Sequence, residues 1–349
     1  EELAAQGVEQ WVYCPRGAPL GRRAAAAGLP VQSYRRSFAW NPLTARRLMK
    51  FCERQGITLI HAHDAHAHTL ACLAASLWGE AALIVVSRRV DFPLRSNPFT
   101  RWKYNHRRVR RILCVSRFIE ALVRPHLEEP LRTRVVYSGV DLGRFPETPN
   151  GSLRQALQVE TDLPLVANVA ALAPHKDYPT FLRAARAFLD RGHRACFLII
   201  GGDAGEEKRV RREVKELGLE GTVHLLGFRT DVPALLPQLD ALLVSSKTEG
   251  LNTTILDAFA CRVPVVATRA GGIPELVEHE TTGLLAPVED PNALAAQLER
   301  LFQEPQLRDR LIANAHQKVQ AFSRQALGRQ SLEVYREILE AELGIVVKL

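Results

Sequence analysis

Short apolar runs alternate with longer segments of helical spacing along the whole chain, which is the pattern of an α/β protein. Each run is continuous rather than alternating, as expected for strands buried on both faces of a parallel sheet. In the first half we expect strands at 11–14, 59–62, 83–87, 112–115 and 135–137, and helices at 43–54, 69–78, 98–108 and 118–126. This alternation predicts a doubly wound parallel sheet.

The same pattern starts again after a polar break at Pro146, Pro149, Asn150 and Gly151. In the second half we expect strands at 165–170, 196–200, 222–226, 239–244 and 263–267, helices at 180–191 and 206–217, and a terminal helix over 324–343. The break predicts two Rossmann-like domains, 1–149 and 150–325, facing a cleft. The terminal segment, 326–349, is expected to pack back on the first domain.

The first seven residues have the character of a helix end, closed by Gly7 and followed by an apolar run. An α/β domain normally opens with a strand and a turn before its first helix. We therefore expect an N-terminal strand and loop to be missing from the start of this chain.

Composition narrows the class of protein. Of the 349 residues, 46% are apolar, but no run approaches the ~20 apolar residues that span a bilayer. The six cysteines form no Cys-x-x-Cys pair and most have apolar neighbours, which favours free thiols in a reducing compartment over disulfides or zinc. No secretory signal is visible. We expect a protein of the cytoplasm, and association with the inner face of the cytoplasmic membrane is an open alternative.

The net charge of +8 favours anionic partners. Much of it lies within 24 residues, at Arg88, Arg89, Arg95, Arg101, Lys103, Arg107, Arg108, Arg110 and Arg111. This cluster fits a solvated helix face, a site for an anionic acceptor such as a lipid phosphate or a phosphorylated oligosaccharide, or peripheral membrane contact. Nucleic acid is not expected as a partner, because no DNA- or RNA-binding motif accompanies the charges.

The most informative segment follows the apolar run 239–244. Glu249 lies on a small-residue turn, and Asp257 is a second carboxylate about one turn into the helix that follows. The candidate caps of this helix are Asn252, Thr253 and Thr254. Ligands of open α/β sheets bind at such strand ends, and a helix N-terminus attracts phosphate. The segment predicts a site for a nucleotide that carries a sugar.

This segment resembles the retaining glycosyltransferases of family 4, which have the GT-B architecture. Their pattern is a glutamate, seven further residues, and a second glutamate within Glu-Ala-Met-Ala; the resemblance covers nearly the whole chain and is densest over 165–291. It implies that Glu249 is a catalytic residue that faces the donor sugar. It also implies that the backbone amides of Gly250, Leu251 and Asn252 contact the sugar and the phosphate, and that Thr253 belongs to the same donor-binding segment. Asp257 replaces the second glutamate, and the resemblance implies that it holds the ribose.

Lys176 follows the first strand of the second half, where an ammonium suits a diphosphate. The family carries an arginine and a lysine here, and the resemblance implies that both grip the donor diphosphate. In this chain the lysine is kept and Ala171 stands in place of the arginine. Lys176 is therefore expected to be the second catalytic residue.

Two further segments resemble donor-side landmarks of the family. Gly227, Phe228 and Arg229 match the Leu-Gly-Phe segment that borders the base of the nucleotide. The turn 201–205 resembles a Gly-Asp-Gly turn, but its pattern is too loose to predict a phosphate loop.

In the first half, His61, His63, His66 and His68 raise the question of a metal, since imidazoles two apart on a strand share a face. The family often carries such a stretch without metal, so we expect none, and weigh an acceptor-side role against packing and loop hydrogen bonds. Arg88 stands where the family often has a histidine near the transfer centre, and Ser116 belongs to a Val-Ser landmark. His63, Arg88 and Ser116 are the acceptor-side candidates.

The resemblance thus implies a metal-independent, retaining transferase without a cofactor. It would move a sugar from a nucleotide-diphosphate sugar to a hydroxyl of a glycan or lipid-linked acceptor, in cell-envelope polysaccharide or lipopolysaccharide synthesis. Two alternatives remain open: a sugar-nucleotide 2-epimerase of the same fold, and a non-catalytic sugar-nucleotide-binding protein. A dinucleotide oxidoreductase is disfavoured, because no Gly-x-Gly-x-x-Gly opens a helix after a strand.

Overall fold

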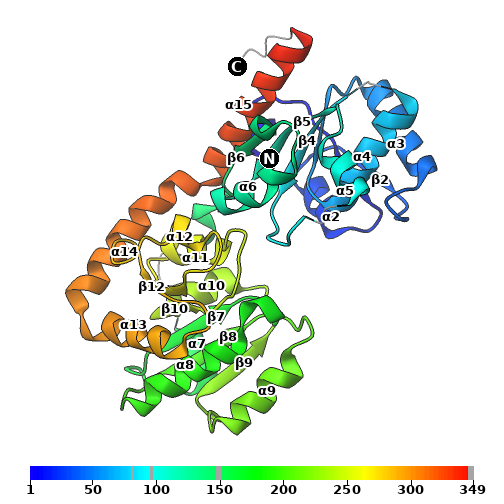
Figure 1. Cartoon of the computed structure of the whole chain (residues 1–349). Helices are drawn as coiled ribbons and strands as arrows, with labels where there is room; N and C mark the ends of the chain where they lie inside the picture. Colours follow the sequence, from blue (N-terminus) through cyan, green and yellow to red (C-terminus); the bar gives the residue numbers. More distant parts are fainter. Residues whose placement is uncertain (80–81, 95–96, 147–150, 345–349) are drawn as a thin grey trace. The chain divides into compact units, whose positions relative to one another are not determined.

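The computed structural model describes residues 1–79, 82–94, 97–146 and 151–344, and they form two compact units (Figure 1). The first unit contains Glu1–Tyr137 together with the chain from Arg324 onward, and the second contains Ser138–Ser323. The division comes earlier than the polar break indicated, and Pro149 and Asn150 of that break lie outside the described residues.

The residues just before the break belong to the second unit because their apolar side chains pack there. Val140 is part of its core, and Leu142 and Phe145 pack against that core. The Val140 N–H also donates to the Phe322 carbonyl at 2.8 Å, which joins the two ends of the unit.

The first unit holds two parallel sheets rather than the single doubly wound sheet expected. One pairs β1 (Val12–Pro15) with β2 (Val31–Tyr34). The other has the order β3-β4-β5-β6, with β3 at Leu59–Ala62, β4 at Leu83–Arg88, β5 at Val109–Cys114 and β6 at Thr133–Val135. The strand β2 was not predicted because only Tyr34 of its four residues is buried, so it shows no apolar run.

The helices of this unit are α1 (Glu2–Ala5), α2 (Pro19–Ala26), α3 (Pro42–Gln55), α4 (Ala65–Trp78), α5 (Pro98–Tyr104) and α6 (Arg117–Val123). Helix α3 begins after Asn41, whose side chain accepts from the amides of Leu43 and Thr44, and ends at Gly56 in the left-handed region. The helix expected over 98–108 ends at Tyr104, because β5 begins at Val109 and carries two arginines at its start. The last strand, β6, lies two residues before its expected place at 135–137.

The terminal helix α15 (Arg324–Leu343) packs on the first unit (Figure 1). Its Val334 and Ile338 share a core with Leu83 and Leu113 of β4 and β5. None of the helices in the described ranges is both long and apolar enough to cross a bilayer.

The second unit is built on a six-stranded parallel sheet with the order β12-β11-β10-β7-β8-β9. Its strands are β7 (Leu165–Val169), β8 (Cys196–Ile200), β9 (Val223–Gly227), β10 (Ala241–Val244), β11 (Val265–Thr268) and β12 (Leu284–Ala286). The strand order reverses between β7 and β10, so the expected doubly wound sheet is present here with its switch point between these two strands.

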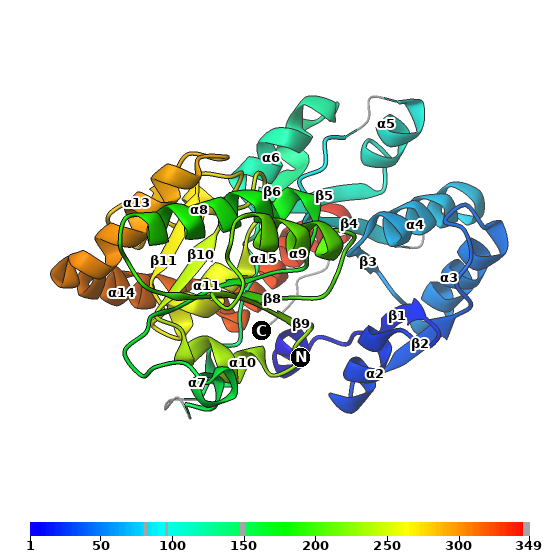
Figure 2. The same cartoon turned by 90° about the horizontal axis from the view of Figure 1, so that it is seen from below.

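Alternate strand residues divide the core of this unit into two layers. Leu165 and Ala167 face one cluster, whereas Val166 faces the other. Figure 2 shows α8 (Tyr178–Asp190) and α13 (Pro291–Gln303) on one side of the strands, and α7 (Ser152–Leu157) and α10 (Val232–Leu235) on the other. The remaining helices are α9 (Glu207–Glu216), α11 (Thr253–Ala260), α12 (Ile273–Leu276) and α14 (Pro305–Val319), and 3-10 turns lie at Arg124–His126, Pro130–Arg132, Leu142–Arg144, Pro174–Lys176, Leu236–Gln238 and Gln320–Phe322.

Candidate functional site

The two residues expected to be catalytic lie at the switch point of the six-stranded sheet. Lys176 ends the 3-10 turn that follows β7, and Glu249 lies in the loop between β10 and α11. The strands themselves are buried and largely apolar, so polar side chains can gather only where the strands end. Since β7 and β10 are neighbours, their carboxyl ends bring these two loops together.

A buried carboxylate is the centre of the site. Glu249 is 7% exposed, and its Oε1 accepts from the Lys176 Nζ at 2.6 Å, the Ser246 Oγ at 2.7 Å and the Asn252 Nδ2 at 2.9 Å. A buried charge is tolerated when it is paired and hydrogen-bonded, and both conditions hold here. The structure therefore brings together three of the predicted residues, and it adds Ser246.

The backbone around Glu249 is fixed by its own hydrogen bonds. The Thr268 hydroxyl donates to the Ser246 carbonyl at 2.6 Å, and the Gly272 N–H donates to the Glu249 carbonyl at 2.8 Å. The Ser245 hydroxyl donates to the Lys176 carbonyl at 2.9 Å, which joins the two loops directly. These contacts hold the carboxylate and the ammonium in a fixed geometry without relying on their own attraction.

Asn252 has two roles in this loop. It is the N-cap of α11, where its side-chain oxygen accepts from the Thr254 N–H at 3.1 Å, while its amide nitrogen donates to Glu249. Thr253 is the exposed first residue of the helix, and the Leu251 side chain packs against the core. The helix start expected near Asn252 is thus present and lies beside the carboxylate.

Asp257 is placed on α11 and is 8% exposed. Its Oδ2 pairs with Arg144 at 2.5 Å, whereas its Oδ1 is buried and has no hydrogen-bond partner among the described residues. Burial raises the pKa of this carboxyl above its ordinary value, and the Arg144 guanidinium opposes that rise. Arg144 was not among the predicted site residues, because no local motif connects it to a carboxylate so far along the chain.

The other donor-side segment lies after β9. Gly227 ends that strand with φ at +66°, and its carbonyl accepts from the Gly201 N–H at 2.9 Å. A Cβ on Gly201 would lie 1.8 Å from the Ala170 carbonyl oxygen, so the loops after β7, β8 and β9 touch backbone to backbone. Phe228 is 77% exposed, and Arg229 pairs with Asp231 at 2.5 Å.

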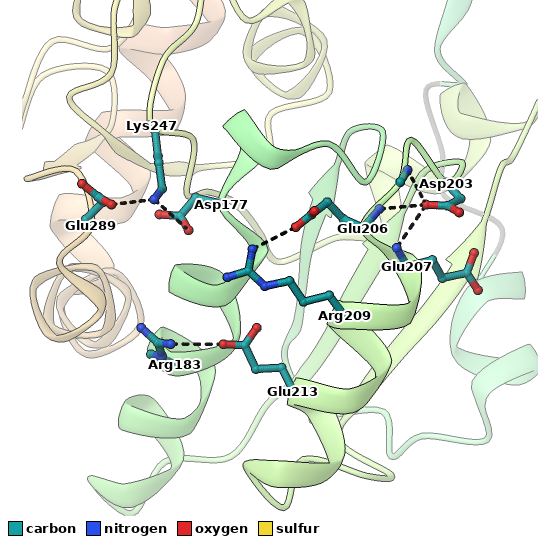
Figure 3. Close-up of polar contacts among 10 residues, drawn as sticks. Asp177, Arg183, Asp203, Glu206, Glu207, Arg209, Glu213, Lys247 and Glu289 are labelled. Atoms are coloured by element: carbon teal, nitrogen blue, oxygen red, sulfur yellow. Dashed lines mark hydrogen bonds and ion pairs between the residues drawn. The ribbon is translucent and has the colours of Figure 1, made fainter.

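The turn 201–205 is a helix cap. The Oδ1 of Asp203 accepts from the backbone amides of Gly205, Glu206 and Glu207 at 2.8 to 3.1 Å, at the start of α9 (Figure 3). These hydrogen bonds lower the pKa of Asp203. Because Asp203 occupies the amides that a phosphate would need, the weak resemblance to a phosphate-binding turn is not supported.

A second lysine in the same region has a different environment from Lys176. Lys247 is 44% exposed and pairs with Glu289 at 2.5 Å and, more distantly, with Asp177 at 3.9 Å (Figure 3). Asp177 also accepts from the Thr180 hydroxyl at 2.6 Å and has φ at +52°. Both lysines are thus paired with a glutamate, but the pair of Lys176 and Glu249 is largely buried and the pair of Lys247 and Glu289 is exposed.

The acceptor-side candidates all lie at strand ends of the four-stranded sheet, but each has its own local contacts. The His63 ring lies tilted against that of His61, with ring centroids 4.0 Å apart, and burial together with Arg89 lowers the pKa of His63. Ser116 is fully buried and caps α6 by accepting from the Ile119 N–H at 3.1 Å. Arg88 donates to the Phe92 carbonyl. Within the described ranges, no three His, Cys, Asp or Glu side chains are placed to hold a metal.

Histidine His61 is held within the first unit. Its Nδ1 lies 2.5 Å from the Tyr335 hydroxyl on α15, its Nε2 lies 2.8 Å from the Ser87 hydroxyl, and burial lowers its pKa well below the ordinary value. Packing and hydrogen bonding therefore account for this residue.

The arginine-rich cluster of the first unit is spread over several structural contacts. Arg101 pairs with Glu128 at 3.3 Å, and Arg110 pairs with Glu342 on α15 at 2.7 Å. The Lys103 ammonium lies 5.6 Å from the centroid of the Phe99 ring. Arg95 lies outside the described residues. These contacts favour a structural role for much of the cluster.

Comparisons with known proteins agree with this geometry. Residues 1–144 match the family described as Glycosyltransferase Family 4, and residues 150–318 match Glycosyl transferases group 1. A D-inositol 3-phosphate glycosyltransferase of Saccharomonospora viridis is 32% identical over 254 residues, covering 68% of this chain and 58% of the relative. An N-acetyl-alpha-D-glucosaminyl L-malate synthase of Bacillus anthracis is 25% identical over 305 residues, covering 84% and 78%. The chain spans only about half of the first relatives, 58% and 49% of their lengths.

Solved structures share the fold along most of the chain. A glycosyltransferase from Rickettsia africae has a TM-score of 0.84 at 19% identity, with 97% of this chain and 93% of that chain covered. HepE from Anabaena, solved in complex with UDP-glucose, has a TM-score of 0.83 at 24% identity, with 96% and 94% covered. The matched halves, the fold and the switch-point carboxylate agree, and the chain belongs to the family 4 glycosyltransferases, with the GT-B fold.

Proposed function

We propose that this protein is a retaining glycosyltransferase that moves a sugar from a nucleotide-diphosphate sugar to a hydroxyl group of an acceptor. The observation that carries the proposal is the pair of Lys176 and Glu249 at the switch point, 2.6 Å apart and fixed by Ser246 and Asn252. An ammonium and a carboxylate held at the carboxyl ends of neighbouring parallel strands suit a ligand with an anionic part and a hydroxyl-rich part.

The donor diphosphate is assigned to Lys176 and the start of α11. An ammonium has three donors, and the contact with Glu249 uses one of them, so the others are available to phosphate oxygens. The helix start adds its positive dipole end. Phe228, exposed at the end of β9, offers a ring face to the base of the nucleotide.

The ribose is assigned to Asp257. Its buried Oδ1 has no donor among the described residues, and a ribose hydroxyl would supply one. Arg144 holds the other oxygen and so orients the shorter acid that replaces the family's glutamate. Arg144 is therefore proposed as a positioning residue for donor binding.

The transfer step needs no covalent intermediate with the protein. The bond from the sugar C1 to the phosphate oxygen breaks, and the acceptor oxygen forms the new bond to C1 from the same face. The acceptor proton passes to the departing phosphate oxygen, whose charge Lys176 stabilises, while Glu249 orients the sugar hydroxyls. We propose that no metal takes part.

The acceptor is proposed to be an anionic glycan or lipid-linked glycan of the cell envelope, modified in the cytoplasm or at the membrane surface. Two relatives are named for D-inositol 3-phosphate and for L-malate, and both of these compounds carry anionic groups. His63 and Arg88 are the proposed acceptor-side residues of the first unit, whereas Ser116, which was also expected there, is buried as the cap of α6.

A pair of lysine variants tests the donor site. Lys176→Met should abolish stabilisation by UDP, GDP and ADP in a thermal-shift assay. Lys247→Met should keep it, because Lys247 is more exposed and pairs with Glu289 rather than with Glu249. A nucleotide at 100 times its dissociation constant should stabilise the unaltered protein by about 2.7 kcal/mol. If none of the three nucleotides stabilises the unaltered protein, the assignment is contradicted.

Product analysis then separates the possible reactions. Incubation of the preferred nucleotide sugar with phosphorylated sugar acceptors should yield a glycoside with the donor's anomeric configuration, read by NMR. Conversion of the nucleotide sugar without an acceptor would indicate an epimerase. Binding of the nucleotide sugar without turnover would indicate a sugar-nucleotide-binding protein.

A further inference from the structure

A cavity of about 750 Å³ lies in the first unit, between the edge of the β1–β2 sheet and α3. Five basic residues line it: Arg16 and Arg35 at the ends of the two strands, and Arg47, Lys50 and Arg54 on the helix. We call it the β2–α3 pocket. Its volume lies in the range of small-molecule sites.

The floor of the pocket is aromatic. The rings of Tyr13 and Tyr34 stack with centroids 4.9 Å apart, and Phe51 lies 5.7 Å from Tyr13. Tyr34 and Phe51 are buried, so the floor is part of the packed core and does not depend on mobile side chains. The pocket is therefore a concave feature with a fixed base and charged walls.

The spacing along α3 places its three cations on one face. Arg47, Lys50 and Arg54 are three and four residues apart, which brings their side chains into neighbouring positions. The opposite face of the helix buries Leu48 and Met49. Like charges one turn apart disfavour a helix, so this arrangement works against the stability of α3.

Among the described residues, none of the five cations is paired with a carboxylate. The pocket lining itself contains no Asp or Glu. Helix α9 differs, because Arg209, Arg211 and Arg212 each pair with a glutamate three or four residues away. The arginines of α9 therefore form the ion pairs typical of a solvent-exposed helix, whereas three basic residues of α3 line a cavity.

We propose that the β2–α3 pocket binds a phosphate ester or diphosphate group. Guanidinium groups present planar, paired donors that match phosphate oxygens, and the lysine adds a point charge. Such an anion would relieve the repulsion among the five cations. The proposal uses residues of the first unit alone and does not depend on the proposed transferase activity.

Calorimetric titration with inorganic pyrophosphate at low salt tests the proposal. All proteins carry Lys176→Met, so that the proposed donor site does not contribute. Arg47→Gln with Lys50→Gln should weaken pyrophosphate binding about tenfold or more, because two charged contacts are lost. Arg211→Gln with Arg212→Gln removes the same charge from another exposed helix and should change the affinity less than about twofold.

Two further outcomes decide the matter, with circular dichroism confirming that each variant is folded. Absence of pyrophosphate binding to the Lys176→Met protein would overturn the proposal, as would equal losses in the α3 and α9 variants. Co-sedimentation with phosphatidylglycerol vesicles, lost in the α3 variant and competed by pyrophosphate, would identify a lipid headgroup as the source of the phosphate. Pyrophosphate binding without sedimentation would identify a soluble phosphate ester.

Discussion

The strand ends of the two units hold polar side chains in different ways. In the second unit, Lys176 and Asn252 reach the same oxygen of Glu249 from separate segments. In the first unit, His63 follows β3 and Ser116 follows β5, two strands that β4 separates, and each contacts residues of its own region. A parallel sheet alone therefore places such residues at one edge without making them converge.

The order of the strands explains the difference. The four-stranded sheet follows the chain order from β3 to β6, so each loop passes to the next strand on the same side. The six-stranded sheet reverses direction between β7 and β10, and the loops on either side of that point lead away to opposite faces. The reversal of strand order leaves space between the loop after β7 and the loop after β10, and Lys176 and Glu249 form their ion pair in that space.

The largest effect is expected from Glu249→Gln. The amide keeps the shape of the side chain but removes the charge that Lys176 balances, so we expect sugar transfer to fall by about a hundredfold to a thousandfold. Initial rates at saturating donor would measure this, with circular dichroism as the control for folding. His63→Asn should reduce transfer less, and the opposite ranking would reverse the comparison between the two units.

Gly201→Ala tests how tightly the loops of the second unit are joined. A methyl group there would lie 1.8 Å from the Ala170 carbonyl oxygen, and we expect a loss of about 3 kcal/mol or more in the free energy of unfolding.

Gly202→Ala is the matched control, because its Cβ would meet Phe228 at an ordinary 3.5 Å. Urea denaturation followed by circular dichroism would compare the two variants. Similar stabilities for both would mean that the loops can separate without cost.

Arg144→Gln should destabilise the protein in a pH-dependent manner. Burial raises the pKa of Asp257, and loss of Arg144 would raise it further. Above that pKa the buried carboxylate is charged and unpaired, so we expect a loss of about 1–2 kcal/mol at pH values of about 8. As the pH falls toward the ordinary carboxyl range, about 4, Asp257 becomes protonated and the loss should shrink.

Urea unfolding of the unaltered protein and of Arg144→Gln at both pH values would measure this effect. A loss of stability that is the same at the two pH values would show that the partner of Arg144 is not the titrating carboxyl.

Ser116→Ala should have the smallest effect. Its hydroxyl caps α6, so we expect a loss of about 1 kcal/mol in stability and little change in transfer per folded molecule. Thermal unfolding and initial rates measured on the same preparation would separate the two effects. Reduced transfer at unchanged stability would instead return Ser116 to the acceptor side.

Much of the second unit could be predicted from its sequence. Its strands are continuous apolar runs, and β8 was predicted at Cys196–Ile200, where the structure has it. Asn252 was one of three candidate caps, and the structure selects it. Lys176 and Glu249 come soon after two such runs, so the pattern alone predicted that they lie at the carboxyl ends of strands.

Other features depend on contacts between distant parts of the chain. The strand β2 is mostly exposed and α2 has only Ala24 buried, so neither carries the apolar pattern that marks an element. The pairing of Arg144 with Asp257 joins residues far apart in sequence, and only the folded unit shows it. The glutamates three and four residues from the arginines of α9 can be seen in the sequence, whereas the cavity that the cations of α3 line is seen only in the folded unit.

The placement of α15 in the first unit has a consequence for biosynthesis. The chain leaves the first unit at Tyr137 and returns at Arg324, so the second unit is an insertion, closed by the contact between Val140 and Phe322. A ribosome would release the whole insertion before the last helix emerges. The insertion can therefore fold during translation, whereas the first unit must wait for Val334 and Ile338 to complete its core.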